Sequence, residues 1–454
     1  MKILITGATG FIGRSLCKAL ALQDHELIVL TRNPSEAREK IPAPHTALDW
    51  NQIPQNLNSI DAVVHLAGES IVAQRWTPAF KARLRDSRIQ STRTLIELFQ
   101  RPGVKKPKVF ISASAIGYYG HCGSEPLPES HPAGSDFLAQ LCREWEAQLF
   151  EADLGETRKV AVRIGVVLGK GGGALDTLIP AFRNTGMAAT LGNGKQWMSW
   201  IHLDDLIPIF IESLNQTQIS GPINACSPHP VTNQEFTESM AKVLHTWGKI
   251  KVPSAALKAT QGEFADSLLS SQRVVPQKLQ ALAFPFRHPN LSEALHHLLG
   301  DSAAQGYEEF LNDCWVPRPI HEVFEFFAAA KNLETITPPW LNFKITSQST
   351  PQIAKGTLIN YRLKIHGLPV RWRTEITEWD PPMTFRDVQL KGPYQTWRHT
   401  HRFTSLRGGT LIEDRVLYRL PLGWLGRLFG GAFVKKDVKT IFGYRSKKIF
   451  GLFA

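Results

Sequence analysis

The sequence predicts an α/β domain with a doubly wound parallel sheet of the Rossmann type, followed by a smaller α+β domain. The chain opens with a strand, a glycine-rich turn, a helix and a second strand, which is the order of a βαβ unit. Its 454 residues exceed what a single hydrophobic core usually holds. Beyond residue 306, alternating apolar and polar segments follow one another and end in a basic amphipathic helix.

The opening unit is the strongest local signal. Lys2–Ile5 is a short apolar strand, Thr6–Gly13 carries three glycines spaced three apart, Arg14–Leu22 has helical periodicity, and Glu26–Thr31 is a second strand. A backbone without side chains can approach a pyrophosphate, and the following helix directs free N–H groups and its positive dipole end at that anion. The strand before the turn and the helix after it favour a cofactor-binding turn over a tight turn that binds no ligand. It predicts a dinucleotide site with contacts from Gly7, Thr9, Gly10, Phe11, Ile12 and Gly13.

The end of the second strand bears on the choice of dinucleotide. An acidic residue there would bind the ribose hydroxyls of NAD, whereas an arginine suits the 2′-phosphate of NADP. The strand ends in Thr31, Arg32 and Asn33, with no acid. We therefore predict NADP(H), with Arg32 at the 2′-phosphate. The alternative is that Arg32 is a solvated loop cation.

Later segments continue the parallel sheet. Thr46–Trp50, Ile60–Leu66 and Lys108–Ser114 are predicted strands, and Phe80–Phe99 is a predicted helix. Small residues at the carboxyl end of such strands let a cofactor lie close to the backbone. We therefore add four residues to the predicted cofactor contacts: Leu66, Ala67, Gly68 and Ser112.

Composition says more about the cellular compartment of the protein than about its function. The five cysteines have no paired spacing, which argues against a disulfide framework or a zinc site and for a reducing compartment. The chain starts directly with a core strand and has no apolar run of about 18 residues, so we expect a cytoplasmic protein without a signal peptide. The net charge of +12 fits nucleic acid, an anionic membrane surface or anionic ligands, and alone does not choose among them.

Several motifs resemble those of one protein family. Five occur in the order seen in extended short-chain dehydrogenases/reductases: Thr6–Gly13, His65–Gly68, Ser112–Gly120, Arg163–Gly165 and Trp200–Asp205. Other phrases look like the atypical branch called the epimerase family of unassigned substrate: Arg75–Thr77, Asp86–Arg88, and Phe137–Ala139 followed by Trp145 and Glu146. The resemblance covers residues 1–300, including a small tail at 252–298. It implies an NAD(P)-binding domain.

The usual catalytic set of that family is incomplete here. Ordinary members use Asn, Ser, Tyr and Lys, with the tyrosine exchanging a proton while hydride passes to or from the nicotinamide. By the resemblance, Ser114 matches the serine and Arg88 replaces the asparagine. Phe137 and Leu141 occupy the tyrosine and lysine positions, and neither side chain can move a proton.

Three interpretations of this departure stay open. Tyr118, Tyr119 or Glu69 can serve as the acid or base, because they adjoin strand ends that face the cofactor. Hydride transfer can instead use a solvent proton, with Ser114 as the hydrogen-bond donor to a carbonyl. The third interpretation is a protein that senses the cofactor without turnover. The leading hypothesis is an oxidoreductase or epimerase acting on a small carbonyl or hydroxyl compound.

Basic residues suggest the character of that substrate. Arg75, Lys81, Arg85 and Arg88 lie on or before the helix after the 67–70 loop, which would suit an anionic or phosphorylated substrate, although a solvated helix face is the alternative. The resemblance adds Arg163 to Arg75 and Arg88 as candidate substrate ligands. No metal site is predicted. His65, His202 and the Asp204-Asp205 pair are expected to be structural, and Gly169–Gly173 to be a flexible substrate-side loop.

After a small polar linker at 300–306, residues 307–454 are predicted to form the second domain. Pro319–Ala330 is a predicted helix, and the last helix spans Phe433–Phe450. Between them we predict six antiparallel strands: Phe343–Gln348, Thr357–Ile365, Val370–Trp379, Thr384–Lys391, Tyr394–Phe403 and Thr410–Leu420.

This pattern, with Asn332-Leu333, Gly392-Pro393-Tyr394 and Trp397, resembles the helix-grip fold of START-like (SRPBCC) proteins. The resemblance implies an apolar cavity for a hydrophobic ligand, with Trp372 and Trp397 as candidate walls, and a filled core as the alternative. His399 and His401 share one strand face, a spacing that permits metal binding, but no third ligand is near in sequence.

The closing helix carries six basic residues between Lys435 and Lys448 and follows an apolar stretch that includes Trp424, Leu425, Leu428 and Phe429. Such a tail suits peripheral contact with an anionic membrane, or its charges only cover a solvated face. Nucleic acid is not expected as a partner, because no binding motif is present.

Overall fold

The computed structural model describes residues 1–52, 57–304 and 306–453. The chain forms two compact units: Met1–Ala37 with His45–Gly300, and Arg38–Pro44 with Asp301–Ala454. Each unit contains one seven-stranded sheet.

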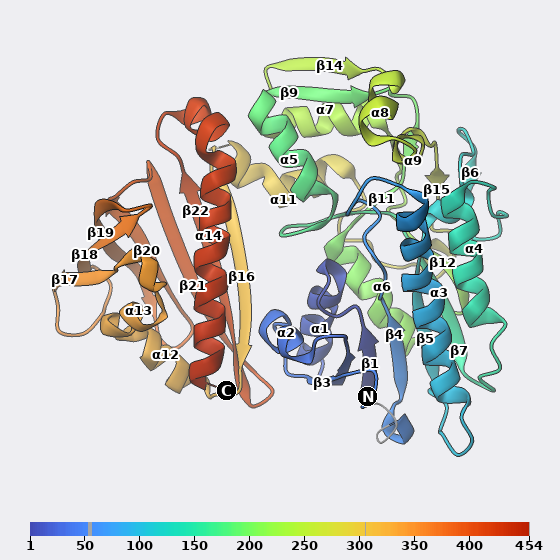
Figure 1. Ribbon diagram of the computed structural model, residues 1–454, viewed down its shortest axis with the longest axis horizontal. Helices are drawn as coiled ribbons and strands as arrows, with labels where there is room; N and C mark the ends of the chain where they lie inside the picture. The colour runs from blue at the N-terminus through green and yellow to red at the C-terminus, as the bar shows by residue number, and fades with distance from the viewer. Residues whose placement is uncertain (53–56, 305, 454) are drawn as a thin grey trace. The chain divides into compact units, whose positions relative to one another are not determined.

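The first unit is built on a parallel sheet (Figure 1). Its strands, in spatial order, are β12 (Gly221–Ala225), β7 (Arg158–Ile164), β5 (Val109–Ala115), β4 (Ala62–His65), β1 (Lys2–Thr6), β2 (Glu26–Leu30) and β3 (Thr46–Leu48). The strand order reverses between β1 and β4, which places a crevice at their carboxyl ends. Apolar runs such as Ile3–Ile5 and Ala62–Val64 are fully buried, as expected for parallel strands covered on both faces. The predicted doubly wound α/β fold is confirmed.

The remaining elements of this unit surround the sheet and build a smaller lobe. The helices that lie wholly or mostly in this unit are α1 (Phe11–Leu22), α2 (Pro34–Lys40), α3 (Pro78–Gln100), α4 (Phe137–Phe150), α5 (Gly173–Thr185), α6 (Leu203–Asn215), α7 (Asn233–Leu244), α8 (Ser254–Gln261), α9 (Phe264–Leu269), α10 (Gln277–Ala281) and α11 (Leu291–Ala304). Paired short strands are β6 (Pro126–Leu127) with β15 (Arg273–Val274), β8 (Val166–Leu168) with β11 (Trp200–His202), β9 (Met187–Leu191) with β14 (Gly248–Val252), and β10 (Trp197–Met198) with β13 (Val231–Thr232).

The second unit is an antiparallel sheet crossed by helices (Figure 1). Its strand order is β16 (Glu308–Val316), β22 (Gly409–Arg419), β21 (Thr396–Leu406), β20 (Thr384–Lys391), β19 (Leu368–Asp380), β18 (Leu358–Ile365) and β17 (Lys344–Gln348). The helices are α12 (Ile320–Ala328), α13 (Ala330–Ile336) and α14 (Gly423–Phe453). Val438 and Phe442 of α14 pack against Val416 and Tyr418 of β22. This architecture confirms the predicted helix-grip fold.

The clearest differences from the predicted elements are the starts of two helices and one strand that was not predicted. Helix α1 begins at Phe11 rather than Arg14, because Gly10 is its N-cap and the end of the glycine turn is already helical. Strand β16 was missed, since its partner β22 lies about a hundred residues away. Helix α14 begins at Gly423 rather than Phe433, so the apolar stretch is part of the helix. The side chains of Trp424, Leu425, Leu428 and Phe429 lie outside the described part of the chain.

The cysteines are all free thiols, and four of them are buried. Burial raises the pKa of Cys17, Cys142 and Cys314 to about 12. Cys226 is also buried, and Cys122 is half-buried. Within the described residues, no helix combines the length and the apolar character that crossing a bilayer requires.

Candidate functional site

The glycine turn between β1 and α1 leaves no room for side chains. Gly7 has a positive φ of 68°, and a Cβ atom there would lie 2.5 Å from the carbonyl carbon of Leu66. A Cβ atom at Gly13 would lie 2.3 Å from the carbonyl oxygen of Gly7. Gly10 is exposed and caps α1 without a side-chain hydrogen bond. The first amides of α1 are therefore available to an anion, and Thr9, Phe11 and Ile12 lie half-buried at this position.

The ring of Phe11 lies against the glycine cluster that precedes α5. Cβ atoms at Gly169, Gly172 and Gly173 would lie 2.8, 2.3 and 2.9 Å from ring atoms of Phe11. The predicted substrate-side loop is thus packed against the first residue of the dinucleotide helix. Side chains at Gly169, Gly172 and Gly173 would collide with the Phe11 ring, whereas a Cβ at Gly171 would meet no atom within 4 Å.

Arg32 lies just after β2, as predicted. Its side chain is exposed and makes no hydrogen bond or ion pair with the described residues. The neighbouring Asn33 is occupied instead, because its Oδ1 accepts hydrogen bonds from Ser35 Oγ at 2.7 Å and Glu36 N at 3.2 Å. Arg32 is therefore free to bind an anion.

The loop after β4 is held by a buried polar chain. The amide of Ala67 donates to Thr6 Oγ1 at 3.2 Å, and this oxygen lies 2.7 Å from His65 Nδ1. His65 Nε2 lies 2.9 Å from Thr92 Oγ1. Burial, followed by the charge of Arg88, lowers the pKa of His65 to about 3. The expectation that His65 is a satisfied core histidine is confirmed.

Arg88 on α3 binds the backbone of the 67–70 loop after β4. Its guanidinium donates to the carbonyl oxygens of Glu69 and Leu84, both at 3.0 Å. Its Cζ atom would lie 3.2 Å from a Cβ at Gly68. Burial lowers the pKa of Arg88. Its donors are engaged with the backbone, which favours positioning of the 67–70 loop over the predicted contact with substrate.

The other basic residues near α3 divide into paired and free side chains. Lys81 Nζ lies 2.8 Å from Glu263 Oε1, and Arg85 Nη1 lies 2.8 Å from Glu144 Oε2. These ion pairs favour the solvated-face interpretation for both residues. Arg75 is exposed and lies beside Gly262, where its guanidinium is accessible to an anionic molecule.

Ser114 belongs to a buried ionic network. Its hydroxyl donates to Glu146 Oε1 at 2.6 Å, and Arg163 donates to both carboxylate oxygens of Glu146, at 2.9 and 2.8 Å. Arg163 is 2% exposed and also donates to the Tyr119 hydroxyl at 2.9 Å. Such a bidentate, fully paired guanidinium is a structural cation. The structure therefore places Arg163 in the core, away from the predicted role as a substrate ligand.

The two tyrosines of the 112–120 turn have different environments. Tyr119 is fully buried, and its hydroxyl donates to Asn224 Oδ1 at 2.7 Å. Burial raises the pKa of Tyr119 despite the neighbouring Arg163. Tyr118 is half-buried, with the Arg163 guanidinium 3.5 Å from its ring centroid. Tyr118 is therefore the better candidate of the two for proton transfer.

The remaining predicted residues lie at the carboxyl ends of β4 and β5. Ser112 is buried, and its hydroxyl donates to the carbonyl oxygen of Ala113 at 3.0 Å. Glu69 is half-buried, and its carboxylate lies 4.0 Å from Arg83 Nη2. Glu69 thus keeps a partly accessible carboxylate, whereas the Ser112 hydroxyl is bound to the backbone of its own strand.

An apolar cluster fills the place of the usual tyrosine and lysine. Phe137 packs edge-on against Trp76, with ring centroids 5.4 Å apart, and Lys81 Nζ lies 5.0 Å from the centre of the Phe137 ring. Leu141 is buried in the same cluster with Phe80 and Leu84. Helix α4 consequently offers no proton-transfer group at these two positions.

The second unit contains a cavity of about 470 Å³. Aromatic and aliphatic side chains form most of its wall, including the predicted Trp372 and Trp397, whose rings are 5.6 Å apart and edge-on. Tyr361 stacks on Trp372 at 5.7 Å. The alternative of a filled core is therefore wrong.

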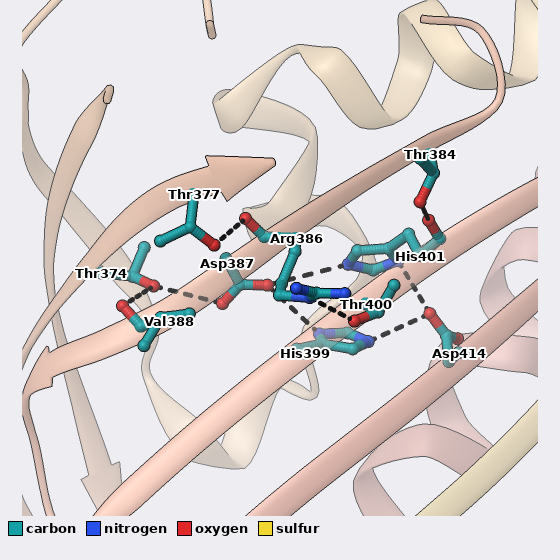
Figure 2. A network of polar contacts seen from close by, with 10 residues as sticks. All are labelled: Thr374, Thr377, Thr384, Arg386, Asp387, Val388, His399, Thr400, His401 and Asp414. Carbon is teal, nitrogen blue, oxygen red and sulfur yellow. Dashed lines mark hydrogen bonds and ion pairs between the residues drawn. The ribbon is translucent and has the colours of Figure 1, made fainter. Parts of the chain in front are cut away.

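A polar cluster lies in the wall of this cavity (Figure 2). It consists of Asp387 on β20, His399 and His401 on β21, and Asp414 on β22. Burial lowers the pKa of both histidines and raises the pKa of Asp387. Burial opposes ionisation of Asp414 too, but the two histidines outweigh it and hold the pKa of this carboxyl well below 3.8.

Sequence reasoning missed Glu146, Asp387 and Asp414 as site residues. Glu146 and Asp414 are acids on otherwise apolar faces: Glu146 shares its helix face with Cys142 and Leu149, and Asp414 alternates with Ile412 and Val416. A buried acid requires a partner, and this was the available signal. The partners come from other strands, so spacing along the chain did not reveal them.

Comparisons with known proteins agree with this architecture. A family model described as the NAD dependent epimerase/dehydratase family matches residues 3–226. A domain of unknown function, DUF1731, matches residues 252–298, and the model for polyketide cyclase / dehydrase and lipid transport matches residues 316–441.

Individual relatives match about two thirds of the chain. The chloroplastic epimerase family protein SDR39U1 homolog of Arabidopsis thaliana is 39% identical, over 66% of this chain and 87% of that protein. The crystal structure of human epimerase family protein SDR39U1 with NADPH is 31% identical, has a TM-score of 0.60, and covers 66% of this chain and all of that one. A nucleoside-diphosphate sugar epimerase from Corynebacterium glutamicum is 34% identical with a TM-score of 0.53, over 67% and 60% of the chains. The chain therefore belongs to the epimerase family proteins of the extended short-chain dehydrogenases/reductases, with a C-terminal START-like domain.

Proposed function

We propose that this protein is an NADP(H)-dependent oxidoreductase or epimerase that acts on a small carbonyl or hydroxyl compound. The observation that carries the proposal is the glycine turn, whose bare amides at the start of α1 lie beside the β1–β4 crevice. The bound cofactor would supply or accept hydride. The human relative whose crystal structure contains NADPH supports the choice of this dinucleotide.

Arg32 is the proposed ligand of the 2′-phosphate. Its exposed guanidinium at the end of β2 has no partner among the described residues, so cofactor binding breaks no existing ion pair. A charge-assisted hydrogen bond of this kind contributes about 1.5–3 kcal/mol. The arginine therefore favours NADPH over NADH by about tenfold to a hundredfold.

The first prediction concerns this preference. In Arg32→Glu, we expect the dissociation constant for NADPH to rise by about tenfold or more while that for NADH changes little, because the lost contact is with the 2′-phosphate. Titration of nicotinamide fluorescence on the full chain measures both constants. Arg101→Glu, which changes the charge equally at an exposed loop position, is the control. An unchanged preference in Arg32→Glu would defeat the assignment.

Glu69 and Tyr118 are the proposed proton-transfer groups. The Ser114 and Tyr119 hydroxyls are bound to Glu146 and Asn224, whereas Glu69 and Tyr118 remain half-buried near the strand ends. Proton transfer by a positioned side chain commonly contributes about 10²- to 10⁴-fold to the rate.

The second prediction tests turnover. We expect NADPH oxidation with a panel of carbonyl compounds, and a drop of about a hundredfold or more in kcat in either Glu69→Gln or Tyr118→Phe, with NADPH affinity retained. Ser114→Ala measures whether the buried serine contributes. A rate that neither Glu69→Gln nor Tyr118→Phe changes would exclude both groups.

A second candidate function is a cofactor sensor without turnover. The observation that favours it is the apolar cluster of Phe137 and Leu141, where ordinary family members carry the proton-transfer groups. A protein that binds NADPH tightly but oxidises it with none of the panel would fit this alternative.

We further propose that the second unit holds a hydrophobic small molecule. Its cavity of about 470 Å³ is within the usual size of ligand pockets, and its walls are mainly aromatic and aliphatic. Native mass spectrometry of the full chain would detect a co-purified ligand by its mass. A protein that never retains one, even after incubation with apolar compounds, would contradict this part of the proposal.

A further inference from the structure

The polar cluster in the cavity wall is created by the register of three strands. On β20 and β21, Asp387 is directly opposite His399, and on β21 and β22, His401 is directly opposite Asp414. His399, His401 and Asp414 are 4–5% exposed. Figure 2 shows the two imidazole rings between the two carboxylates.

Asp414 determines which nitrogen of each histidine carries a proton. Its Oδ1 lies 3.1 Å from His399 Nε2 and 2.7 Å from His401 Nδ1. A carboxylate accepts hydrogen bonds and does not donate them, so both of these nitrogens are N–H donors. In a neutral imidazole, the other nitrogen then bears a lone pair.

Both lone pairs are directed toward a second carboxylate. His399 Nδ1 lies 3.5 Å and His401 Nε2 lies 4.0 Å from Asp387 Oδ2. The other Asp387 oxygen lies 3.2 Å from the Thr374 hydroxyl, which fixes the orientation of the carboxylate. Three electron-pair donors thus converge on one point, with ligand atoms all within 4.8 Å of one another. Such an arrangement is repulsive unless a cation lies between the donors.

We propose that Asp387, His399 and His401 bind a divalent first-row transition metal ion, such as iron(II) or zinc. Two imidazole nitrogens and one carboxylate oxygen are a donor set that these ions prefer. With ligand bonds of about 2.1 Å, donors of one ion are separated by about 3–3.5 Å. The Asp387–His399 separation of 3.5 Å has this value, and His401 needs a closer approach of about 0.5 Å.

Asp414 then does not bind the metal ion itself but positions the two histidine ligands. A ligand histidine commonly donates its second N–H to a carboxylate, which fixes the ring and raises its basicity. Here the Asp414 carboxylate accepts a hydrogen bond from His399 Nε2 and makes a close charge contact with His401 Nδ1. The stacked ring of Phe385, 4.2 Å from the ring centroid of His401, restricts the second histidine further.

An ion with three protein ligands keeps open coordination positions, and these face the cavity, because all three ligands line it. Two further donors in the same wall, Trp372 Nε1 and Arg445 Nε, are buried without a partner among the described residues. We therefore expect the cavity ligand to be a hydrophobic molecule with an oxygen-donor, anionic head group. This last step rests on the proposed ligand-binding function, whereas metal binding does not.

A second histidine cluster, in the first unit, differs from this one because ordinary hydrogen bonds explain its contacts. The amide of Asp204 donates to His202 Nδ1 at 2.9 Å, so His202 Nε2 carries the proton and donates to His297 Nδ1 at 3.2 Å. Donors and acceptors alternate along this chain of contacts. A proton therefore lies between the two nitrogen atoms of each close contact, and no metal ion is needed to explain the cluster.

Titration with cobalt(II) tests the proposal on the full chain after dialysis against a chelator. We expect one visible d–d absorption signal that saturates at one equivalent, and displacement of the cobalt by zinc. Asp387→Asn and His401→Gln should each abolish the signal. Asp414→Asn should weaken binding by about 10- to 100-fold while leaving the signal's shape, as expected for a residue that only positions the ligands.

Three controls locate the ion. His321→Gln, at an exposed position of α12, should leave the titration unchanged. His297→Gln should also leave it unchanged, and loss of the signal only in that variant would place the ion in the first unit. X-ray absorption of the wild-type protein, which needs no variant to fold, should show two imidazole ligands. Absence of the cobalt signal, or equal affinity in wild type and Asp387→Asn, would overturn the proposal.

Discussion

Replacing Gly7 with alanine is expected to lower the affinity of the full chain for NADPH by at least about a hundredfold. The new Cβ atom would lie 2.5 Å from both the carbonyl carbon and the carbonyl oxygen of Leu66, which are backbone atoms at the end of β4 and cannot rotate away. The turn must shift, and the amides that follow it leave the pyrophosphate. Losing one or two charge-assisted hydrogen bonds costs about 3 kcal/mol, which is about a hundredfold in affinity.

The matched control for this prediction is Gly103→Ala. Gly103 also has a positive φ, 75°, so both substitutions carry a similar backbone strain, but its Cβ would meet no atom within 4 Å. Isothermal titration with NADPH compares the two variants. If Gly103→Ala binds as weakly as Gly7→Ala, backbone strain rather than the close approach explains the loss.

The second large effect is expected on stability, from the buried pair of Arg163 and Glu146. Arg163→Met leaves the Glu146 carboxylate, 6% exposed, without its cation. Breaking a buried ion pair from one side typically costs about 3–5 kcal/mol, because the remaining charge stays desolvated. We expect a loss of this size in the unfolding free energy of the first unit.

The double variant Arg163→Met/Glu146→Met separates charge from packing. Replacing both partners by apolar side chains removes the buried charge, and stability should return to within about 1–2 kcal/mol of wild type. Hydrogen exchange of peptides from β7 and α4 reports the first unit without assuming that the two-unit chain unfolds in one step. If the double variant is as unstable as Arg163→Met, the pair stabilises the first unit mainly by packing and not by pairing its charges.

The fold could be predicted because its signals are local. The strands of the first sheet are continuous apolar runs, and the glycines of the 6–13 turn mark one strand end and one helix start. The predicted bounds of β20, Thr384–Lys391, agree with the structure at both ends. Strand β16 was missed because its pairing with β22 depends on contacts far apart in the sequence.

The candidate sites were harder to predict for the same reason. Arg163 was interpreted from its motif as a substrate ligand, but Glu146, which neutralises it, comes from α4 and not from the neighbouring sequence. The spacing of His399 and His401 permits metal binding, but the third candidate ligand is not their neighbour in the sequence. Asp387 lies opposite His399 only through strand register. Side chains that meet across a sheet cannot be paired without knowing that register.

The burial of the thiols has a practical consequence. A thiolate is the form that reacts with alkylating reagents, so Cys17, Cys142 and Cys226 in the first unit, and Cys314 in the second, become reactive only when the surrounding structure opens. Because Cys314 lies on β16, the rate of its alkylation reports only the opening of the helix-grip sheet. Mass-resolved labelling of the untagged chain therefore follows the two units separately, without any engineered probe.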